Sequence, residues 1–301
     1  MLEDEFGDVV AKARGGLGLD LGQLSAATGI PPADIERIEA CALAPSDDQA
    51  IALAGALRLR SEPLLDLARG RYAPAPATAG AGPWQVRCLT LSGPGGFTSN
   101  TYLLWHEGEA DALIVDPGFE PDRITQEIQV LALEPRLIAV THGHRDHVGQ
   151  AAALARRWDI PVLLGAEDLA LVPSPERTPA FRMVAGGERV PLGRHELSVR
   201  AAPGHTAGGR VYAVGDSIPR RPPDEAGRGP DARPAATGVA FVGDTLFAGS
   251  IGRTFGGPMD YPVHLETVRQ GILGLGPTTR LCPGHGPQTT VGQERAHNPF
   301  A

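Results

Sequence analysis

The pattern of apolar and polar positions divides the chain into a helical part and a mixed part. In residues 1–70, apolar residues recur at helical spacing, as at Ile35 and Ile38, and no segment alternates as a strand would. Gly29 separates two short helical patterns, LGQLSAAT and PPADIERIEA, and the paired prolines suit the first turn of the second one. We therefore predict a small all-α domain over residues 1–70.

A segment rich in alanine, proline and glycine follows, and we interpret residues 71–84 as a linker. From residue 85 onward, short apolar runs end in Gly, Asp or Pro, which is typical of strands: WQVRCLTL, TYLLWH, ALIVDPG, RLIAVTHGH, PVLLG, LSVRAAPGH, VAFVGDTLF and RLCPGHG. Helical patterns lie between some of these runs: PDRITQEIQVLAL, VGQAAALARRW and VHLETVRQGILGL. Residues 85–301 are therefore predicted to form a layered α/β domain.

Residues 215–238 interrupt this domain without any periodicity, and they are rich in Pro, Gly, Asp and Arg. Because such a composition cannot bury much apolar surface, we predict a disordered surface loop inserted between two strands. The strand that follows runs toward Asp244, so the insertion is expected at the opposite end of that strand.

Composition and charge exclude several classes of protein. The formal net charge of −8 argues against non-specific nucleic-acid binding by the whole chain, because an acidic protein gains nothing from counterion release. The three cysteines are odd in number and lack C-x-x-C spacing, which argues against a disulfide framework or a cysteine zinc site. No apolar run approaches 18 residues, and the first ten residues do not have the pattern of a signal peptide. We expect a cytoplasmic protein without membrane contact.

Histidines and aspartates gather where predicted strands end beside glycines. His142 and His144 are two residues apart, so in an extended segment both side chains can face one ion. Asp146 and His147 follow at once, in the turn into a helical pattern, where they can serve a second ion. Three further candidates follow later strands, in the motifs Pro-Gly-His205-Thr, Gly-Asp244-Thr and Pro-Gly-His285-Gly. Imidazole and carboxylate are ligands that zinc prefers, so we predict a metal site. The other histidines are expected to be ordinary residues: His106, His195, His264 and His297.

These motifs resemble those of the metallo-β-lactamase superfamily. The run THGHRDH matches its T-H-x-H-x-D-H signature, later motifs follow in the family's order, and Asp116-Pro117-Gly118 resembles its early D-P-G. The resemblance covers roughly residues 85–301 and implies an αβ/βα sandwich with metals at one edge, between the two sheets. It implies His142, His144 and His205 as ligands of a first ion, Asp146, His147 and His285 as ligands of a second, and Asp244 as a bridge between both. It also implies that Asp116 orients a ligand histidine.

The residue types point to hydrolysis by activated water. No serine or cysteine has the setting of a nucleophile, and no G-x-S-x-G motif occurs. Zinc lowers the pKa of bound water to about 7, and a second ion can hold the resulting hydroxide and polarise the substrate. Asp146 is placed to orient the hydroxide and to carry a proton as the catalytic residue. We expect two divalent ions and a carbonyl or phosphate ester substrate; zinc is favoured, and iron or manganese also suits these ligands.

Within the superfamily, the sequence resembles the glyoxalase II branch. GDTLFAGSIGRT is similar to that branch's G-D-T-L-F followed by a G-K or G-R pair, and the end of the chain resembles an E-R-x-x-N-P-F ending of short bacterial members. The resemblance implies hydrolysis of S-acylglutathione thioesters such as S-lactoylglutathione, with Arg253 binding a carboxylate of glutathione. The branch's tyrosine two positions later is Phe255 here, and its C-terminal helical extension is missing, so another thiol carrier stays open.

A sister branch, the mononuclear iron persulfide dioxygenases, is the alternative. Its later motifs read P-A-H-D and G-D-A-L, whereas this chain has PGHG and GDTL, which favours the two-metal hydrolase. A β-lactamase or an RNA-processing role is less favoured, because neither a signal peptide nor a basic surface is evident.

Residues 1–70 resemble a Cro/repressor-type helix-turn-helix domain, in the stretch that includes Leu24, Gly29, Ile30 and Ile38. Such domains place their second helix in the major groove of DNA, which raises the alternative of a regulator with a metal-binding sensor domain. Twelve carboxylates against six basic residues give residues 1–70 a net charge of −6, which disfavours contact with phosphates. A protein-interaction or dimerisation module is the favoured interpretation, and a homodimer is compatible with it.

Overall fold

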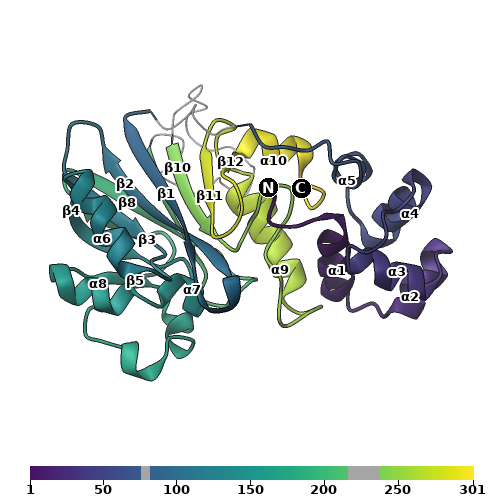
Figure 1. Ribbon diagram of the computed structural model, residues 1–301, viewed down its shortest axis with the longest axis horizontal. Coiled ribbons are helices and arrows are strands. Elements are labelled where there is room, and N and C mark those ends of the chain that lie inside the picture. Colours follow the sequence, from purple (N-terminus) through teal and green to yellow (C-terminus); the bar gives the residue numbers. More distant parts are fainter. Residues whose placement is uncertain (76–81, 216–237) are drawn as a thin grey trace.

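The computed structural model of the protein describes residues 1–75, 82–215 and 238–301 (Figure 1). The middle of the predicted linker and the predicted insertion, apart from its two end residues, lie outside these described residues.

Five helices form the N-terminal region: α1 (Phe6–Leu17), α2 (Leu21–Thr28), α3 (Pro32–Glu39), α4 (Asp47–Leu57) and α5 (Ser61–Ala68). Local signals set their ends. The Asp20 side chain accepts a hydrogen bond from Gln23 N at 2.7 Å, and the Gln23 side chain accepts one from Asp20 N at 2.9 Å, which satisfies two free amides at the start of α2. Gly29 ends α2 with a φ of 73°, a conformation that glycine adopts without strain. The structure therefore confirms that this region is helical.

Two six-stranded sheets form the rest of the fold. The first has the order β1-β2-β3-β4-β5-β6: β1 (Trp84–Ser92), β2 (Thr98–His106), β3 (Asp111–Val115), β4 (Glu134–Ala139), β5 (Val162–Leu164) and β6 (Phe181–Met183). The β1–β2–β3 pairs are antiparallel, and the remaining pairs are parallel. The second sheet has the order β12-β11-β10-β9-β8-β7: β7 (Arg189–Leu192), β8 (His195–Ala201), β9 (Arg210–Gly215), β10 (Gly238–Gly243), β11 (Arg280–Pro283) and β12 (Thr289–Thr290). Only its β10–β11 pair is parallel.

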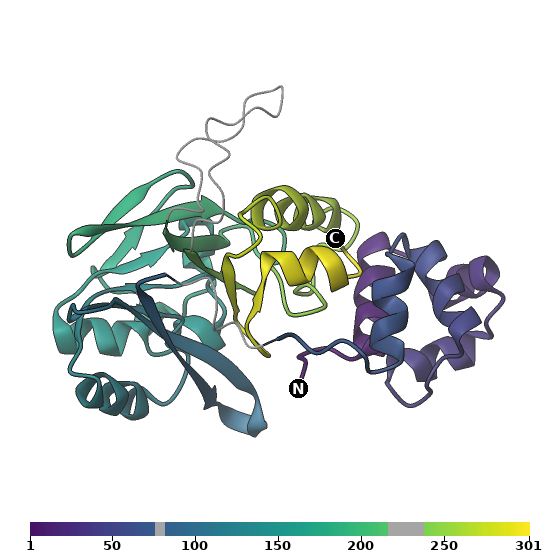
Figure 2. The ribbon, with the colours of Figure 1, turned by 90° about the horizontal axis from the view of Figure 1, so that it is seen from above.

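Helices cover the outer faces of both sheets (Figures 1 and 2). They are α6 (Pro121–Val130), α7 (Arg145–Val148), α8 (Ala151–Trp158), α9 (Tyr261–Glu266), the π-helix η4 (Thr267–Ile272) and α10 (Val291–His297). Three short 3-10 turns complete the described elements: η1 (Pro94–Gly96), η2 (Ala166–Ala170) and η3 (Ser174–Glu176).

Side chains alternate between the two faces along each strand, and the buried apolar side chains form three layers. On β3, Leu113 and Val115 point between the two sheets, whereas Ala112 and Ile114 pack against α6 and α8. On β10, Phe241 belongs to the layer between the sheets, and its neighbours belong to the layer under the C-terminal helices. Successive strand residues point to opposite faces, so each central strand serves two layers at once.

The third layer joins the N-terminal helices to the second sheet. Val9 of α1 and Leu53 of α4 belong to the same buried cluster as Val242 of β10 and Ile272 of η4. Tyr72, just after α5, is 8% exposed in this cluster. Residues 1–70 therefore share a continuous apolar core with the C-terminal part of the sandwich.

The predicted αβ/βα sandwich is confirmed by these two sheets flanked by helices. All eight apolar runs that predicted strands contain one, and the three helical patterns contain α6, α8 and α9 with η4. The sequence pattern did not indicate the short or edge strands β6, β7 and β12, the central strand β9 or the helix α10. Among the described residues, no helix is both long enough and apolar enough to cross a membrane.

Candidate metal centre

Seven candidate ligands from segments that follow four strands lie close together. The loop after β4 and the short helix α7 carry four of them, and the segments that follow β8, β10 and β11 carry one each. They form overlapping groups whose ligand atoms lie within 4.8 Å of one another: His142, His144 and His205; His142, His147 and Asp244; Asp146, His147 and His285.

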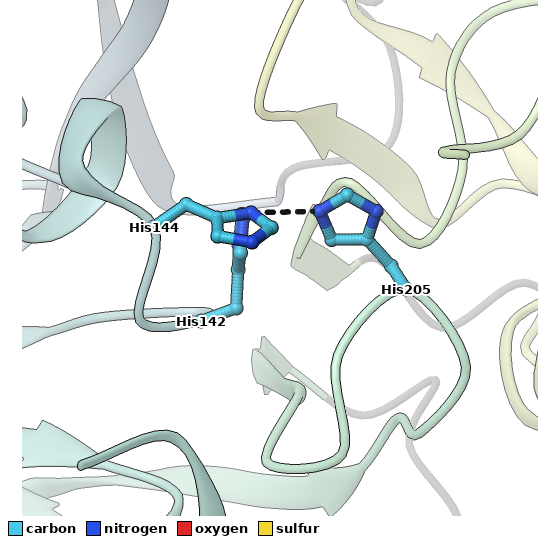
Figure 3. A group of neighbouring side chains, drawn as sticks. All are labelled: His142, His144 and His205. Carbon is cyan, nitrogen blue, oxygen red and sulfur yellow. Dashed lines mark hydrogen bonds between the residues drawn. The ribbon is translucent and has the colours of Figure 1, made fainter. Parts of the chain in front are cut away.

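The first group consists of three imidazoles, with His205 facing the other two across the site (Figure 3). His205 Nε2 lies 3.1 Å from His144 Nδ1. The His205 ring stands nearly perpendicular to the rings of His142 and His144, at 88° and 87°. Nitrogens that converge from three planes in this way can point at one central ion.

The second group adds carboxylates. Asp146 Oδ2 lies 3.1 Å from His147 Nε2 and 3.2 Å from His285 Nε2. Asp244 lies between the two groups: its Oδ2 is 3.6 Å from His205 Nε2 and 3.5 Å from His285 Nε2, and its Oδ1 is 3.4 Å from His147 Nε2. One carboxylate therefore faces both groups.

Unpartnered buried atoms show that these residues fit divalent cations. His142 Nε2, His147 Nε2 and Asp244 Oδ1 are buried, and none has a hydrogen-bond partner within the part of the chain that the structure describes. A buried polar atom without a partner costs about 1–3 kcal/mol, and cations bound at the two groups would satisfy all three. Imidazole nitrogens with carboxylate oxygens are the donor set of zinc and iron sites.

The charge states of the candidate ligands also favour the binding of cations. Burial and the neighbouring His147 lower the pKa of His142 well below its ordinary value, so this imidazole is neutral, as a metal ligand must be. Burial would also lower the pKa of His285, but hydrogen bonds to Asp146 and Asp244 outweigh it and raise the pKa to about 10. The carboxylates thus attract a positive charge to the second group.

Polar contacts behind the ligands fix their orientation. Asp116 Oδ2 accepts hydrogen bonds from Thr141 Oγ1 at 2.7 Å and from His147 Nδ1 at 3.1 Å. His205 Nδ1 lies 2.7 Å from the Arg253 carbonyl, and His285 Nδ1 lies 2.7 Å from another backbone carbonyl. An outer nitrogen that donates to such an acceptor leaves Nε2 free to face the centre.

Asp168 is a functional residue that the sequence analysis missed. It is 1% exposed in η2, and its Oδ2 accepts hydrogen bonds from Gly143 N at 2.9 Å and Thr206 Oγ1 at 2.7 Å. Its Oδ1 accepts one from Gly208 N at 2.6 Å. This carboxylate ties the loop of His142 and His144 to the loop of His205. No motif marks it in the sequence, because its partners lie 25 to 40 residues away.

Glu294, from the C-terminal E-R-x-x-N-P-F motif, holds the segment after Asp244. Its buried carboxylate accepts hydrogen bonds from Tyr72 Oη at 2.6 Å, Thr289 Oγ1 at 2.7 Å and Gly249 N at 2.9 Å. Asn298 Nδ2 donates a fourth at 2.9 Å. The motif therefore has a structural role, and it links the N-terminal region to the loop that follows Asp244.

Aromatic rings flank the open side of the centre. Phe255 is 69% exposed, and its ring lies 5.6 Å from the rings of His144 and His205. Phe97 is also exposed, 5.4 Å from the His285 ring. The Arg253 side chain is exposed, and its backbone carbonyl lies beside His205.

The remaining histidines lie in hydrogen-bonded or stacked settings. Glu109 Oε1 is 3.0 Å from His106 Nδ1 and 2.9 Å from His195 Nε2, and it also pairs with Arg194. His264 Nε2 lies 2.7 Å from a backbone carbonyl, and His297 stacks on Tyr72. The three cysteines are free, in agreement with the predicted lack of a disulfide framework.

Comparison with known proteins gives a consistent set of matches. Residues 94–231 match the family described as the metallo-beta-lactamase superfamily. The chain is 32% identical over 206 residues to the hydroxyacylglutathione hydrolase GloC of Haemophilus influenzae, covering 68% of this chain and 93% of the relative.

Solved structures of the same fold also match. The B3 metallo-beta-lactamase BLEG-1 superposes with a TM-score of 0.58 at 29% identity, over 72% of this chain and 99% of its own. TTHA1623 in a di-iron-bound form gives 0.54 at 31% identity, over 71% and 100%. ETHE1 from Myxococcus xanthus gives 0.54 at 25% identity, over 71% and 83%.

Proposed function

The chain belongs to the metallo-beta-lactamase superfamily, and on that basis we propose that this metal-dependent hydrolase is a binuclear thioester hydrolase of the glyoxalase II type. Its substrate would be an S-acylglutathione such as S-lactoylglutathione, or another acyl thioester. The observation that carries the proposal is Asp244, whose carboxylate faces both groups of candidate ligands. The similarity to a hydroxyacylglutathione hydrolase supports the substrate class.

Each group would hold one divalent cation. His142, His144 and His205 would bind the first, and Asp146, His147 and His285 would bind the second, with Asp244 shared. When bound, two such cations supply the Lewis acidity that polarises a carbonyl group and makes water acidic near neutral pH. Zinc is the favoured metal, and the di-iron form of TTHA1623 supports iron as well.

Asp146 would be the catalytic carboxylate. Burial alone would raise its pKa, but the neighbouring imidazoles of His147 and His285 hold the pKa far below its ordinary value. The carboxylate is therefore ionised and can accept a hydrogen bond from the attacking water. In thioester hydrolysis the water oxygen bonds to the carbonyl carbon, the C–S bond breaks, and the thiolate takes up the released proton. An ionised carboxylate at the ligand cluster can relay that proton.

Two exposed residues would meet the substrate. Arg253 is an exposed cation whose backbone lies beside His205, which suits a carboxylate on the thiol carrier. The nearby Phe255 offers an apolar ring without the hydroxyl of the glyoxalase II tyrosine, so the carrier is defined less closely than the reaction.

The alternative is an iron-dependent persulfide dioxygenase, which the likeness to ETHE1 supports. Two observations favour the hydrolase over it. The second group, Asp146, His147 and His285, is a complete set of ligands, and Asp244 joins it to the first group. A centre for one iron would need only one such set.

Metal analysis together with substrate turnover tests the proposal. Purified protein loaded with zinc or with iron is assayed with S-lactoylglutathione and, separately, with glutathione persulfide under oxygen. The proposal predicts two ions per chain and thiol release from the thioester. One iron per chain with oxygen consumption on the persulfide would establish the dioxygenase. The same preparation in a shift assay on promoter DNA at low salt is expected to show no complex, and a complex that is specific for one DNA sequence would support the regulator.

A further inference from the structure

The N-terminal helix α1 packs directly on the segment that follows Asp244. A β-carbon built on Gly16 would lie 2.4 Å from the Tyr261 ring, and one built on Gly18 would lie 2.5 Å from Pro258. No side chain fits at either position, so the backbone of α1 approaches this segment as closely as it can. Figures 1 and 2 show α1 beside the C-terminal helices.

Lys12 of α1 is the only lysine in the chain; the other 26 basic residues are arginines. Its side chain is 8% exposed. The ammonium group pairs with the Asp4 carboxylate, donates to the Ile251 carbonyl at 2.8 Å, and lies 4.8 Å from the centre of the Phe247 ring. A compact ammonium with three donors serves these three partners, whereas the planar guanidinium of arginine would not.

The partners of the Lys12 ammonium group lie next to residues of the candidate metal centre. The Phe247 ring packs against the ring of His285 at 5.7 Å. Ile251 stands two residues before Arg253, whose carbonyl lies 2.7 Å from His205 Nδ1. The segment from Phe247 to Arg253 thus connects Lys12 with a histidine of each group.

The first residues of the chain reach the centre from the same side. A β-carbon built on Gly286 would lie 3.0 Å from the backbone nitrogen of Glu3, so the N-terminal segment covers the residue next to His285. Asp4, the partner of Lys12, is buried beside it.

We infer that the N-terminal helical region is part of the active site, and that Lys12 is a positioning residue that fixes the segment 247–253 beside the metal ligands. The inference rests on the proposed function only for its kinetic consequence. A fixed segment keeps the backbone of Arg253 in place, so that its exposed side chain starts from a defined position near His205. In this way the N-terminal region would support the segment of the hydrolase domain that carries Arg253.

Several basic residues of the N-terminal region take part in contacts within the protein. Arg14 forms hydrogen bonds of 2.6 and 2.7 Å with Glu39, Arg60 donates to a C-terminal carbonyl at 2.6 Å, and Arg69 pairs with Asp47.

The test uses a double variant of the full chain, Asp4→Asn with Lys12→Met. Changing both partners avoids leaving the buried Asp4 carboxylate without a counter-charge, which would destabilise the fold by itself. Lys12→Arg is the second variant, because it keeps the charge but not the geometry. Asp34→Asn with Arg37→Met is the matched control: it also neutralises one ion pair, but one whose side chains are 35% and 58% exposed on α3.

The first readout is hydrogen exchange of the zinc-loaded proteins and does not depend on any substrate. The amides of Phe247 and Ser250 each donate to the other residue's carbonyl at 3.1 Å, so they report on the segment directly. We expect both amides to exchange at least about tenfold faster in the double variant and in Lys12→Arg, because local opening becomes easier, with β4 amides unchanged. The control variant, Asp34→Asn with Arg37→Met, should match the wild type. Unchanged exchange at Phe247 and Ser250 in both Lys12 variants would overturn the inference.

The second readout separates positioning from general damage. With S-lactoylglutathione, the double variant should show a KM raised about tenfold at unchanged metal content, since Arg253 loses its fixed place while the ligands remain. An equal fall in kcat and in bound metal, with KM unchanged, would contradict a positioning role. A wild-type protein that hydrolyses no thioester would defeat the proposed function, and the hydrogen-exchange result would still decide the role of Lys12.

Discussion

The three hydrogen bonds of Asp168 tie two loops together, and we call this contact the Asp168 clamp. Its contribution to the free energy of unfolding can be predicted from the structure. Asp168→Asn replaces one carboxylate oxygen by an amide that donates hydrogen bonds. Asp168 Oδ2 accepts two of the three hydrogen bonds, from Gly143 N and Thr206 Oγ1, so the asparagine oxygen is expected to take that place. The new amide then faces Gly208 N, which is itself a donor and now has no acceptor.

The cost has two parts. A buried donor that loses its acceptor costs about 1–3 kcal/mol, and the remaining bonds lose the strength that an ionised acceptor gives them, about 1 kcal/mol in total. We therefore expect the free energy of unfolding to fall by about 2–4 kcal/mol. Both loops that carry the first group of histidines depend on Asp168, so metal affinity should fall about 10–100-fold as well.

The assay is urea denaturation of the metal-free protein in chelator, followed by zinc titration of the folded protein. Measuring stability without metal prevents a change in affinity from appearing as a change in stability. Asp122→Asn, an exposed carboxylate at the start of α6, is the control and should stay within about 0.5 kcal/mol of the wild type. A variant at position 168 that unfolds with the wild-type free energy and binds zinc with wild-type affinity would refute the clamp.

Three further predictions concern the other contacts around the centre. Asp116→Asn should lower metal affinity or kcat about 10–100-fold, because His147 loses its charged partner; wild-type values in a zinc titration and a rate assay would contradict this role. Tyr72→Phe should lower the free energy of unfolding by about 1–3 kcal/mol, because the buried Glu294 carboxylate loses a donor at 2.6 Å. Denaturant melts would show no shift if the contact were immaterial. Removal of metal by a chelator should lower the melting temperature, since orphaned buried atoms of the ligands lose their partner, and an unchanged Tm would argue against a bound metal.

The parts of the fold that could be predicted are those whose signals are local. The run from Thr141 to His147 carries four candidate ligands within six positions, and the later ones each follow a strong apolar strand. Central strands such as β10 alternate between two buried layers and are therefore apolar throughout, which makes them easy to recognise. The three-residue β6 and the four-residue β7 lie at sheet edges and carry too little pattern to stand out.

The parts that could not be predicted depend on contacts between distant positions. Asp168 looks like any aspartate after a strand, and only its partners in two other loops give it a role. The change of composition after residue 70 indicates a linker, yet residues on both sides of it share one apolar core. Lys12 and Ile251 are 239 positions apart, and no local pattern links them.

The most direct test of the two-cation centre is a titration of metal-free protein with zinc, in which the rate of S-lactoylglutathione hydrolysis is followed at each addition. Because Asp244 faces two complete groups of ligands, we predict that the rate rises until two equivalents of zinc per chain have been added and then stays constant. A rate that is already maximal at one equivalent, or no hydrolysis at any equivalence, would contradict it.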